Sequence, residues 1–235
     1  MKKEHLLFLF LIIFNFIFSF SIEEKDDFIN SFATDIDRAI KFIDNHKDEI
    51  IEISKDYNID VNIALSIMFP ELVRYNQLKD QIEISANKLF YIKWGSEYAD
   101  FSIGILQMKP TFIERLANTR KRDKYDNLFL YPENYSKEDI RGIIIDRLQD
   151  VDYQLKYLAY FINIIDTSNE VNFKNNYDKI IYYATAYNAG SWYNEDNNQK
   201  LSKKKTYPYG ANNEKIKQYS YADISLYYYQ NILNK

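Results

Sequence analysis

The chain has 235 residues, of which 46% are hydrophobic, 17% aromatic and 27% charged, and its formal net charge is −4. This length suits one domain of ordinary size, and five glycines and four prolines are too few for a collagen-like or disordered chain. Cysteine is absent and the histidines are His5 and His46, which excludes disulfide frameworks, thiolate metal sites, thiol catalysis and the H-E-x-x-H zinc motif.

The first 21 residues have the three parts of a secretory signal peptide. A basic Lys2-Lys3 start precedes an apolar run over residues 6–18, and small residues at Ser19 and Ser21 fit cleavage after Ser21. An uncleaved membrane anchor is the alternative, since the run approaches the length that spans a bilayer. No cysteine stands at the cleavage point, which excludes a lipoprotein. We therefore expect export across the inner membrane, to the periplasm or the exterior, and the acidic charge argues against nucleic acid as a partner.

Two helices are predicted in the first part of the exported chain. Apolar residues recur at helical spacing over residues 36–53, which predicts a helix that begins near Thr34 or Asp35 and ends at Asn58. The next helix begins near Asp60 and is apolar on almost all sides, which is typical of a buried central helix. Pro70 is expected to disrupt its end, because proline cannot donate to the helical hydrogen-bond ladder.

The rest of the chain is predicted to alternate helices with long polar loops. Residues 76–100 are less regular, and the alternation of polar and apolar residues at 81–85 fits a short strand as well as a helix. Helices are expected over residues 110–116, 140–165, 177–187 and 213–232, with polar loops at 121–135 and 194–213. Ser136 starts a capping box before the longest run, and Gly190 supplies a left-handed residue after the helix at 177–187. The sequence therefore predicts one all-α domain with long loops over residues 22–235.

Glu71 is the first candidate for chemistry, because it is an ionisable residue that closes the apolar helix. Burial disfavours a charged carboxylate, so a buried Glu71 is expected to hold its proton near neutral pH. Cleavage of a glycosidic bond needs such an acid, because the leaving oxygen must receive a proton. The alternative is a solvent-facing Glu71 paired with Arg74 one turn later, which would lower its pKa and oppose acid catalysis. This motif alone favours the alternative.

Two further motifs combine a glycine with polar side chains. In residues 100–111, Gly104 permits a close backbone approach and Gln107 offers a hydrogen-bond donor and an acceptor, although a packed turn explains the same pattern. In residues 184–190, a helix end presents Tyr187 and Asn188 where the chain turns, which suits the binding of hydroxyl and acetamido groups. Taken singly, that motif is an ordinary glycine-terminated helix.

In this order, the three motifs resemble those of the lysozyme-like superfamily of lytic transglycosylases and goose-type lysozymes. That family has a Glu at the end of a buried helix, then Gly-Leu-Met-Gln followed by Pro, then Ala-Tyr-Asn-Ala-Gly. The corresponding residues here are Glu71, Gly104-Ile105-Leu106-Gln107 with Pro110-Thr111, and Ala186-Tyr187-Asn188-Ala189-Gly190. The resemblance covers about residues 60–190, and Ala-Tyr-Asn-Ala-Gly is its most specific part. It implies a lysozyme-like helical fold and makes Glu71 the expected catalytic residue.

The chain also departs from the family pattern. Leu72 follows Glu71 where the family usually has serine, and Tyr98 stands where a serine commonly lies before the motif glycine. Leu106 replaces the usual methionine, although Met108 is near. The separation between the first two motifs is longer than is typical, so residues 76–100 are expected to form an inserted lobe.

The resemblance implies cleavage of the β-1,4 bond between N-acetylmuramic acid and N-acetylglucosamine in the glycan strands of peptidoglycan, with no metal or organic cofactor. Glu71 would act first as the acid and then as the base. Tyr187 and Asn188 would position the acetamido group or Glu71 itself. The remaining expected substrate-binding residues are Ser102, Gln107 and Met108.

Four possibilities follow from the same residues. Asp100 is the candidate for a second carboxylate that activates water, in which case the product is that of a goose-type lysozyme. Without a carboxylate facing Glu71, the sugar's own 6-hydroxyl attacks and a 1,6-anhydro product forms. A non-catalytic envelope protein that binds glycan strands in the same cleft is a further alternative, and a secreted interaction protein that matches the motifs by chance is the weakest.

Overall fold

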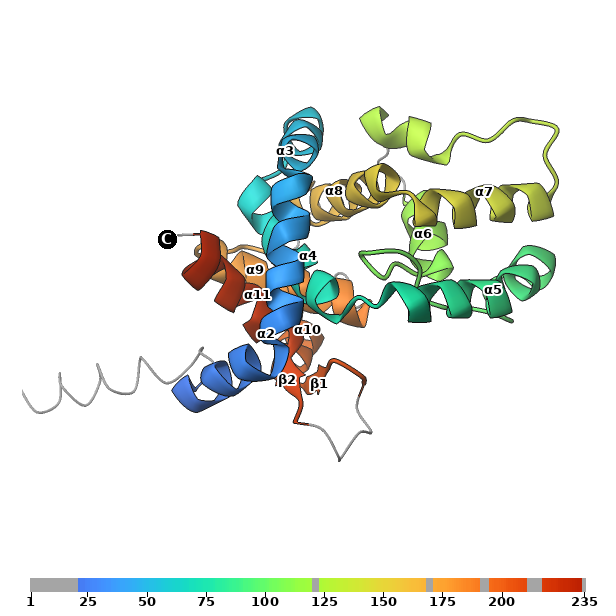
Figure 1. Ribbon diagram of the computed structural model, residues 1–235. Coiled ribbons are helices and arrows are strands. Elements are labelled where there is room, and N and C mark those ends of the chain that lie inside the picture. Colours follow the sequence, from blue (N-terminus) through green and yellow to red (C-terminus); the bar gives the residue numbers. More distant parts are fainter. Residues whose placement is uncertain (1–20, 120–122, 168–170, 191–194, 211–216, 234–235) are drawn as a thin grey trace, which may run out of the picture.

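The structure is a computed structural model that describes residues 21–119, 123–167, 171–190, 195–210 and 217–233. Figure 1 shows that this part of the chain is mostly helical, with one small antiparallel hairpin of two strands. The prediction of an all-α fold is confirmed. The predicted signal peptide lies outside the described residues except for Ser21, and no helix within the described ranges has the length and apolarity needed to cross a membrane.

The first two helices within the described residues are α2 (Ile22–Asn45) and α3 (Lys47–Asp56). The apolar face predicted over residues 36–53 is buried. The predicted start at residue 34 or 35 lies just after a kink at Phe32, where α2 leaves helical geometry, but the prediction of a single helix to residue 58 is wrong. Ser21 caps α2, since its hydroxyl oxygen accepts a hydrogen bond from the Glu24 N–H at 3.1 Å. The chain leaves helical geometry at His46, which separates α2 from α3.

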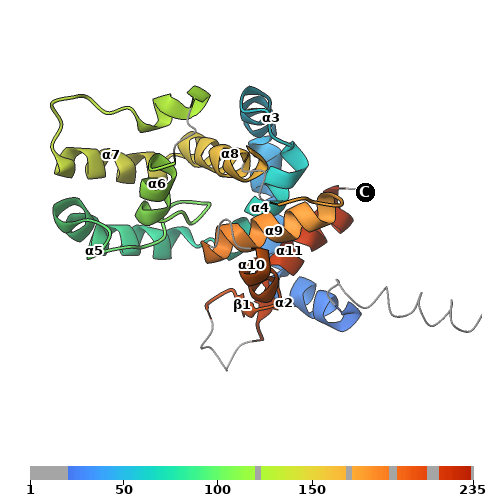
Figure 2. The same cartoon turned by 180° about the vertical axis from the view of Figure 1, so that it is seen from behind.

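Helix α4 (Val61–Arg74) is the buried central helix that the sequence predicted. Every residue from Ile63 to Val73 is buried, because α2 packs on the side seen in Figure 1 while α9 and α11 pack on the side seen in Figure 2. The prediction that Pro70 disrupts the helix is wrong, since α4 continues to Arg74. Two tyrosine hydroxyls from the C-terminal part support carbonyls in this stretch: Tyr221 donates to Ile67 O and Tyr207 to Pro70 O, both at 3.0 Å.

A second group of helices projects to one side of α4. These elements are α5 (Gln77–Trp94), α6 (Pro110–Ala117), η1 (Asp123–Phe129), α7 (Lys137–Gln149) and α8 (Val151–Thr167). In Figure 1 and Figure 2, α5 and α7 lie side by side at the far end of this group. The short strand offered for 81–85 is wrong, because Asn76 caps a continuous helix over Gln77–Trp94. The run predicted over 140–165 breaks at Asp150, whose side chain caps the start of α8.

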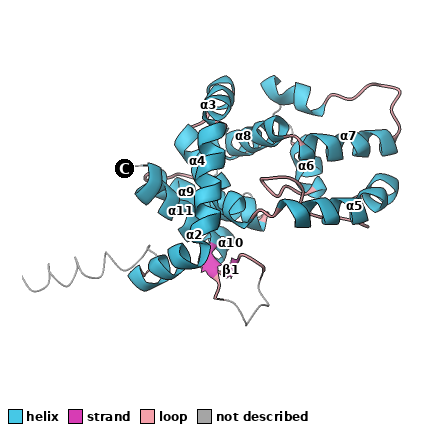
Figure 3. Cartoon of the chain, viewed as in Figure 1, coloured by secondary structure: helices cyan, strands magenta, loops and turns pink. Residues whose placement is uncertain are grey.

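The C-terminal part returns to α4. Its elements are α9 (Asn176–Ala189), α10 (Glu195–Ser202), β1 (Lys205–Tyr207), β2 (Tyr219–Ser220), α11 (Tyr221–Tyr228) and η2 (Tyr229–Leu233). The helix predicted at 177–187 is confirmed and ends at Gly190, whose φ is 63°. The loop predicted over 194–213 is wrong where α10 and β1 form, and the helix predicted over 213–232 begins instead at Tyr221, after the hairpin shown in Figure 3.

Candidate active site

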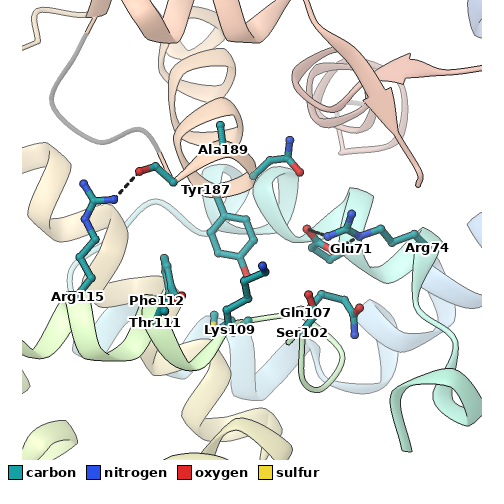
Figure 4. A pocket seen from close by; sticks show the side chains of 13 residues that line it. Glu71, Arg74, Ser102, Gln107, Lys109, Thr111, Phe112, Arg115, Tyr187 and Ala189 are labelled. Carbon is teal, nitrogen blue, oxygen red and sulfur yellow. Dashed lines mark hydrogen bonds and ion pairs between the residues drawn. The ribbon is translucent and has the colours of Figure 1, made fainter. Parts of the chain in front are cut away.

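Glu71 lies in the last turn of α4 and is only 1% exposed. It nevertheless lines a cavity of about 320 Å³, which lies where α4, the turn at residues 102–109, α6 and the C-terminal end of α9 meet (Figure 4). The carboxyl group therefore faces neither bulk solvent nor a closed core. A buried ionisable group beside an open cavity is the pattern expected of a functional site.

Arg74 forms a bidentate ion pair with Glu71. Its Nη2 donates to Glu71 Oε1 at 2.8 Å and its Nε donates to Glu71 Oε2. The ion pair between Glu71 and Arg74, which the sequence offered as an alternative, is therefore present. The solvent-facing position of Glu71 in that alternative is wrong, because the side chain is buried. Burial raises the pKa of Glu71 above its ordinary value, and the charge and hydrogen bonds of Arg74 oppose that rise without cancelling it.

Tyrosine side chains enclose the Glu71–Arg74 pair. Burial raises the pKa of Tyr187, Tyr207 and Tyr221 well above 10, so these phenols stay neutral. The Tyr221 hydroxyl also lies near enough to Glu71 to favour its charged form. Sequence reasoning missed Tyr207 and Tyr221, because they come from the hairpin and from α11, more than a hundred residues beyond Glu71, and no motif marks them.

The turn at residues 102–109 is fixed by its own backbone hydrogen bonds and by close packing against Gln154. Ile103 and Met108 pair through backbone hydrogen bonds of 2.9 and 3.1 Å, and Gly104 has a φ of 70°. A Cβ on Gly104 would lie 1.9 Å from Gln154 Nε2, so only glycine fits. Gln154 is buried on α8 and bonds the turn twice, accepting from Leu106 N–H at 2.9 Å and donating to Ile103 O at 2.8 Å. The close backbone approach that the sequence predicted at Gly104 is thus an approach of the Gly104 backbone to the Gln154 side chain.

Gln107 projects from this turn and is fixed by two acceptors. Its Nε2 donates to Gly104 O at 2.8 Å and to Asp80 Oδ1 at 3.2 Å. Asp80 also accepts the Gly104 N–H at 3.0 Å, and burial raises the pKa of its carboxyl. Sequence reasoning missed Asp80, because the segment around it gave no clear periodicity. With two donors committed to the protein, the amide of Gln107 is preorganised beside the cavity.

The end of α9 is tied to both neighbouring elements. The Tyr187 hydroxyl donates to Leu106 O at 2.7 Å, and its ring packs edge-on against Phe112 and Phe161. Arg115 of α6 donates to Gly190 O at 2.5 Å, the contact drawn in Figure 4. These bonds fix the mutual position of the second and third motifs. Asn188 is exposed and lines the same cavity.

The structure brings most of the predicted site residues to one place. Those that line the cavity with Glu71 are Ser102, Gln107, Met108, Tyr187 and Asn188. Asp100 does not: its carboxylate accepts the Thr111 N–H at 3.2 Å and the Thr111 hydroxyl at 2.8 Å, and it lies 3.3 Å from Lys109 Nζ. Asp100 therefore fixes the start of α6 and is not part of the cavity wall that the structure describes.

The charges around the cavity are unequal. Among the described residues that line it, Glu71 is the sole carboxylate, whereas Arg74, Lys109 and Arg115 are cationic. Within the described ranges, no group of three or more histidine and carboxylate side chains is arranged to hold a metal ion. In comparisons with known proteins, no family model matches the chain, and no curated protein or solved structure matches it.

Proposed function

We propose that the chain is a peptidoglycan lytic transglycosylase that cleaves the β-1,4 bond between N-acetylmuramic acid and N-acetylglucosamine. The observation that carries this proposal is the convergence of three motifs, distant in sequence, on one cavity. Glu71, Gln107 and the Tyr187-Asn188 pair all line it. A buried carboxyl group with a raised pKa beside an open cavity is what protonation of a glycosidic oxygen requires.

In the first half of the reaction, Glu71 transfers its proton to the bridging oxygen. The bond between that oxygen and the anomeric carbon breaks, and N-acetylglucosamine leaves with a hydroxyl group. The acetamido oxygen of the remaining sugar bonds to the anomeric carbon, as in other substrate-assisted glycosidases. Arg74 then stabilises the carboxylate that Glu71 has become, through the bidentate contact already formed.

In the second half, the 6-hydroxyl of the muramic sugar attacks the anomeric carbon. Glu71 takes the hydroxyl proton, the acetamido oxygen is released, and a 1,6-anhydro ring closes. The acid is regenerated and no water is consumed. That Glu71 is the sole carboxylate among the described lining residues supports this route over hydrolysis, because a goose-type lysozyme needs a way to activate water.

A non-catalytic protein that binds glycan strands is the second candidate function. Arg74 contacts both oxygens of Glu71, which favours the carboxylate and disfavours the acid. In such a protein, the same cavity would hold the sugar without cleaving it.

Digestion of purified cell-wall sacculi by the wild type, Glu71→Gln and the control Glu133→Gln tests these functions. Glu133 is exposed in the segment before α7, so its substitution makes the same change of a carboxyl group to an amide away from the cavity. We expect Glu71→Gln to release muropeptides about 100-fold more slowly or worse, as loss of a general acid predicts, and Glu133→Gln to act like the wild type. Undiminished release by Glu71→Gln refutes the acid role.

Mass spectrometry of the released muropeptides separates the remaining possibilities, because the anhydro product is lighter than the hydrolytic one by one water. Anhydro ends support the transglycosylase, and reducing ends indicate a lysozyme. A wild-type protein that sediments with sacculi but releases nothing soluble is a binding protein.

A further inference from the structure

A second hollow, of about 420 Å³, adjoins the Glu71 cavity. The two share Arg74, Ser102 and Gln107 in their walls, so they meet at the Glu71–Arg74 pair. The second hollow lies between α2, the start of α5 and the segment that follows β1. The two hollows are thus immediate neighbours, with the same three side chains in the walls of both.

The lining of this second hollow is polar and balanced in charge. Its described lining residues include three carboxylates and three cations, namely Asp35, Asp80 and Glu83 with Arg38, Arg74 and Lys79. Several of these charges are already neutralised within the protein: Arg38 lies 2.6 Å from Asp35 and also donates to Val73 O at 2.9 Å. A hollow without excess positive charge does not suit a polyanion. It suits a ligand that is neutral and rich in hydroxyl and amide groups.

Tyr209 supplies a large aromatic surface at the edge of this hollow. It is 61% exposed and follows Pro208 immediately after β1. Gly210, with a φ of 87°, turns the chain behind it, and its N–H donates to Thr206 O at 2.7 Å. Lys79 Nζ lies 6.0 Å from the ring centre. The ring thus has a defined place beside polar groups and yet remains largely uncovered.

The combination of an exposed ring and a polar wall matches the two sides of a sugar. A β-linked hexosamine has hydroxyl and acetamido groups around its rim and an apolar face of C–H bonds. Such a face packs flat on an aromatic ring, whereas the hydroxyl and acetamido groups around the rim form hydrogen bonds.

We propose that the second hollow is a further glycan subsite in which Tyr209 stacks against a sugar ring. A strand whose scissile bond lies at Glu71 would then extend past Arg74 to the segment after β1. The identity of the ligand as a β-1,4-linked amino-sugar strand rests on the function proposed above. The chain should accordingly bind long oligomers more tightly than short ones, with Tyr209 responsible for part of the difference.

The test measures calorimetric binding of β-1,4-linked N-acetylglucosamine oligomers to the full chain carrying Glu71→Gln, which separates binding from cleavage. Tyr209→Ala in that background should weaken binding of the hexamer about tenfold and change binding of the dimer less than twofold. Tyr209→Trp should restore hexamer binding. The control is Tyr135→Ala, an exposed tyrosine that lines neither hollow.

The outcomes separate this subsite from the catalytic proposal. Equal hexamer affinity in Tyr209→Ala and its parent overturns the subsite, as does a parent that binds no hexamer, and neither result depends on whether sacculi are cleaved. Loss of hexamer affinity with recovery in Tyr209→Trp supports the subsite even if the wild type releases no muropeptides. Thermal unfolding of each variant shows whether a loss of binding comes from misfolding, and an unfolded Tyr209→Ala protein would refute the exposed position of the ring.

Discussion

Replacement of Arg74 by methionine is the most direct test of the electrostatics around Glu71. The variant keeps most of the side-chain volume but leaves a carboxyl group, 1% exposed, without its charged partner. Breaking a buried ion pair by removing one member costs about 3–5 kcal/mol of folding stability. Since the Arg74 side chain is 25% exposed, water screens part of the interaction and we expect the lower end of that range. For a chain of this size, a loss of about 3 kcal/mol lowers the melting temperature by roughly 6–12 °C.

The loss should depend on pH in a defined direction. Burial raises the pKa of Glu71 above its ordinary value of 4.5, so the folded state binds this proton more tightly than the unfolded state. Stability from this group is therefore greatest in acid and decreases as the pH rises from about 4.5 through the folded-state pKa. Without Arg74 that pKa is higher still. Arg74→Met should consequently be destabilised more at pH 8 than at pH 5.

Urea unfolding followed by tryptophan fluorescence at the two pH values measures this difference. Arg141→Met is the matched control, because Arg141 donates to the carbonyls of Ile92 and Lys93 and its removal strands no carboxylate. Adding Glu71→Gln to Arg74→Met should recover stability at pH 8, since the glutamine amide is uncharged at this pH and needs no charged partner. A loss that is equal at pH 5 and pH 8, or smaller than about 1 kcal/mol, would refute the view that Arg74 compensates a buried charge at Glu71.

Three further predictions concern activity and the turn that faces the cavity. If Glu71 supplies the proton, muropeptide release should decrease as the pH rises through its raised pKa, and a rate that instead increases as the pH rises would exclude it as the acid. Gly104→Ala should cost roughly 2–5 kcal/mol in urea unfolding, because the new Cβ meets Gln154 and φ is positive, whereas Gly142→Ala, whose Cβ meets nothing within 4 Å, should be neutral or slightly stabilising. Tyr187→Phe removes the hydrogen bond to Leu106 O and should lower the free energy of unfolding by about 1 kcal/mol. We expect kcat for sacculi to decrease more than KM rises. An unchanged melting temperature would show that the bond is not made in solution.

Sequence patterns predicted the elements whose apolar spacing is regular. Helix α4 was identifiable because it is apolar on all sides, and α9 because Gly190 follows a clear helical run. The segment around Asp80 was ambiguous, since α5 buries only part of its surface and its apolar residues do not form a continuous stripe. The prediction at Pro70 was wrong for a different reason. Its cost to the helix is a local property, whereas the tyrosine hydroxyls that support the neighbouring carbonyls come from the hairpin and from α11.

The candidate site also divides into residues that a local sequence pattern marks and residues that only tertiary packing brings together. The motifs located Glu71, Gln107 and Tyr187, because each stands at a helix end or a glycine turn that a sequence pattern can mark. No pattern indicated that Asp80 fixes Gln107, since the two become neighbours only when α5 folds back beside the turn. The place of Asp100 within a motif predicts a role in the site, yet its carboxylate accepts hydrogen bonds from Thr111 at the start of α6 instead. Positioning contacts of this kind depend on tertiary packing and leave little local signal.

The Glu71–Arg74 pair bears on the proposed chemistry more directly than the cavity itself. A residue that first gives a proton and later takes one works best when its pKa lies near the working pH, because either extreme blocks one half of the cycle. Burial alone would raise the pKa of Glu71 and keep the proton on it before the reaction, and Arg74 alone would lower the pKa and help Glu71 to give the proton up. The two influences act on the same carboxyl group in opposite directions. An arginine beside the carboxylate is therefore compatible with an acid that must also become a base. Its removal leaves the new carboxylate without a charged partner, and so should slow proton delivery more than proton return.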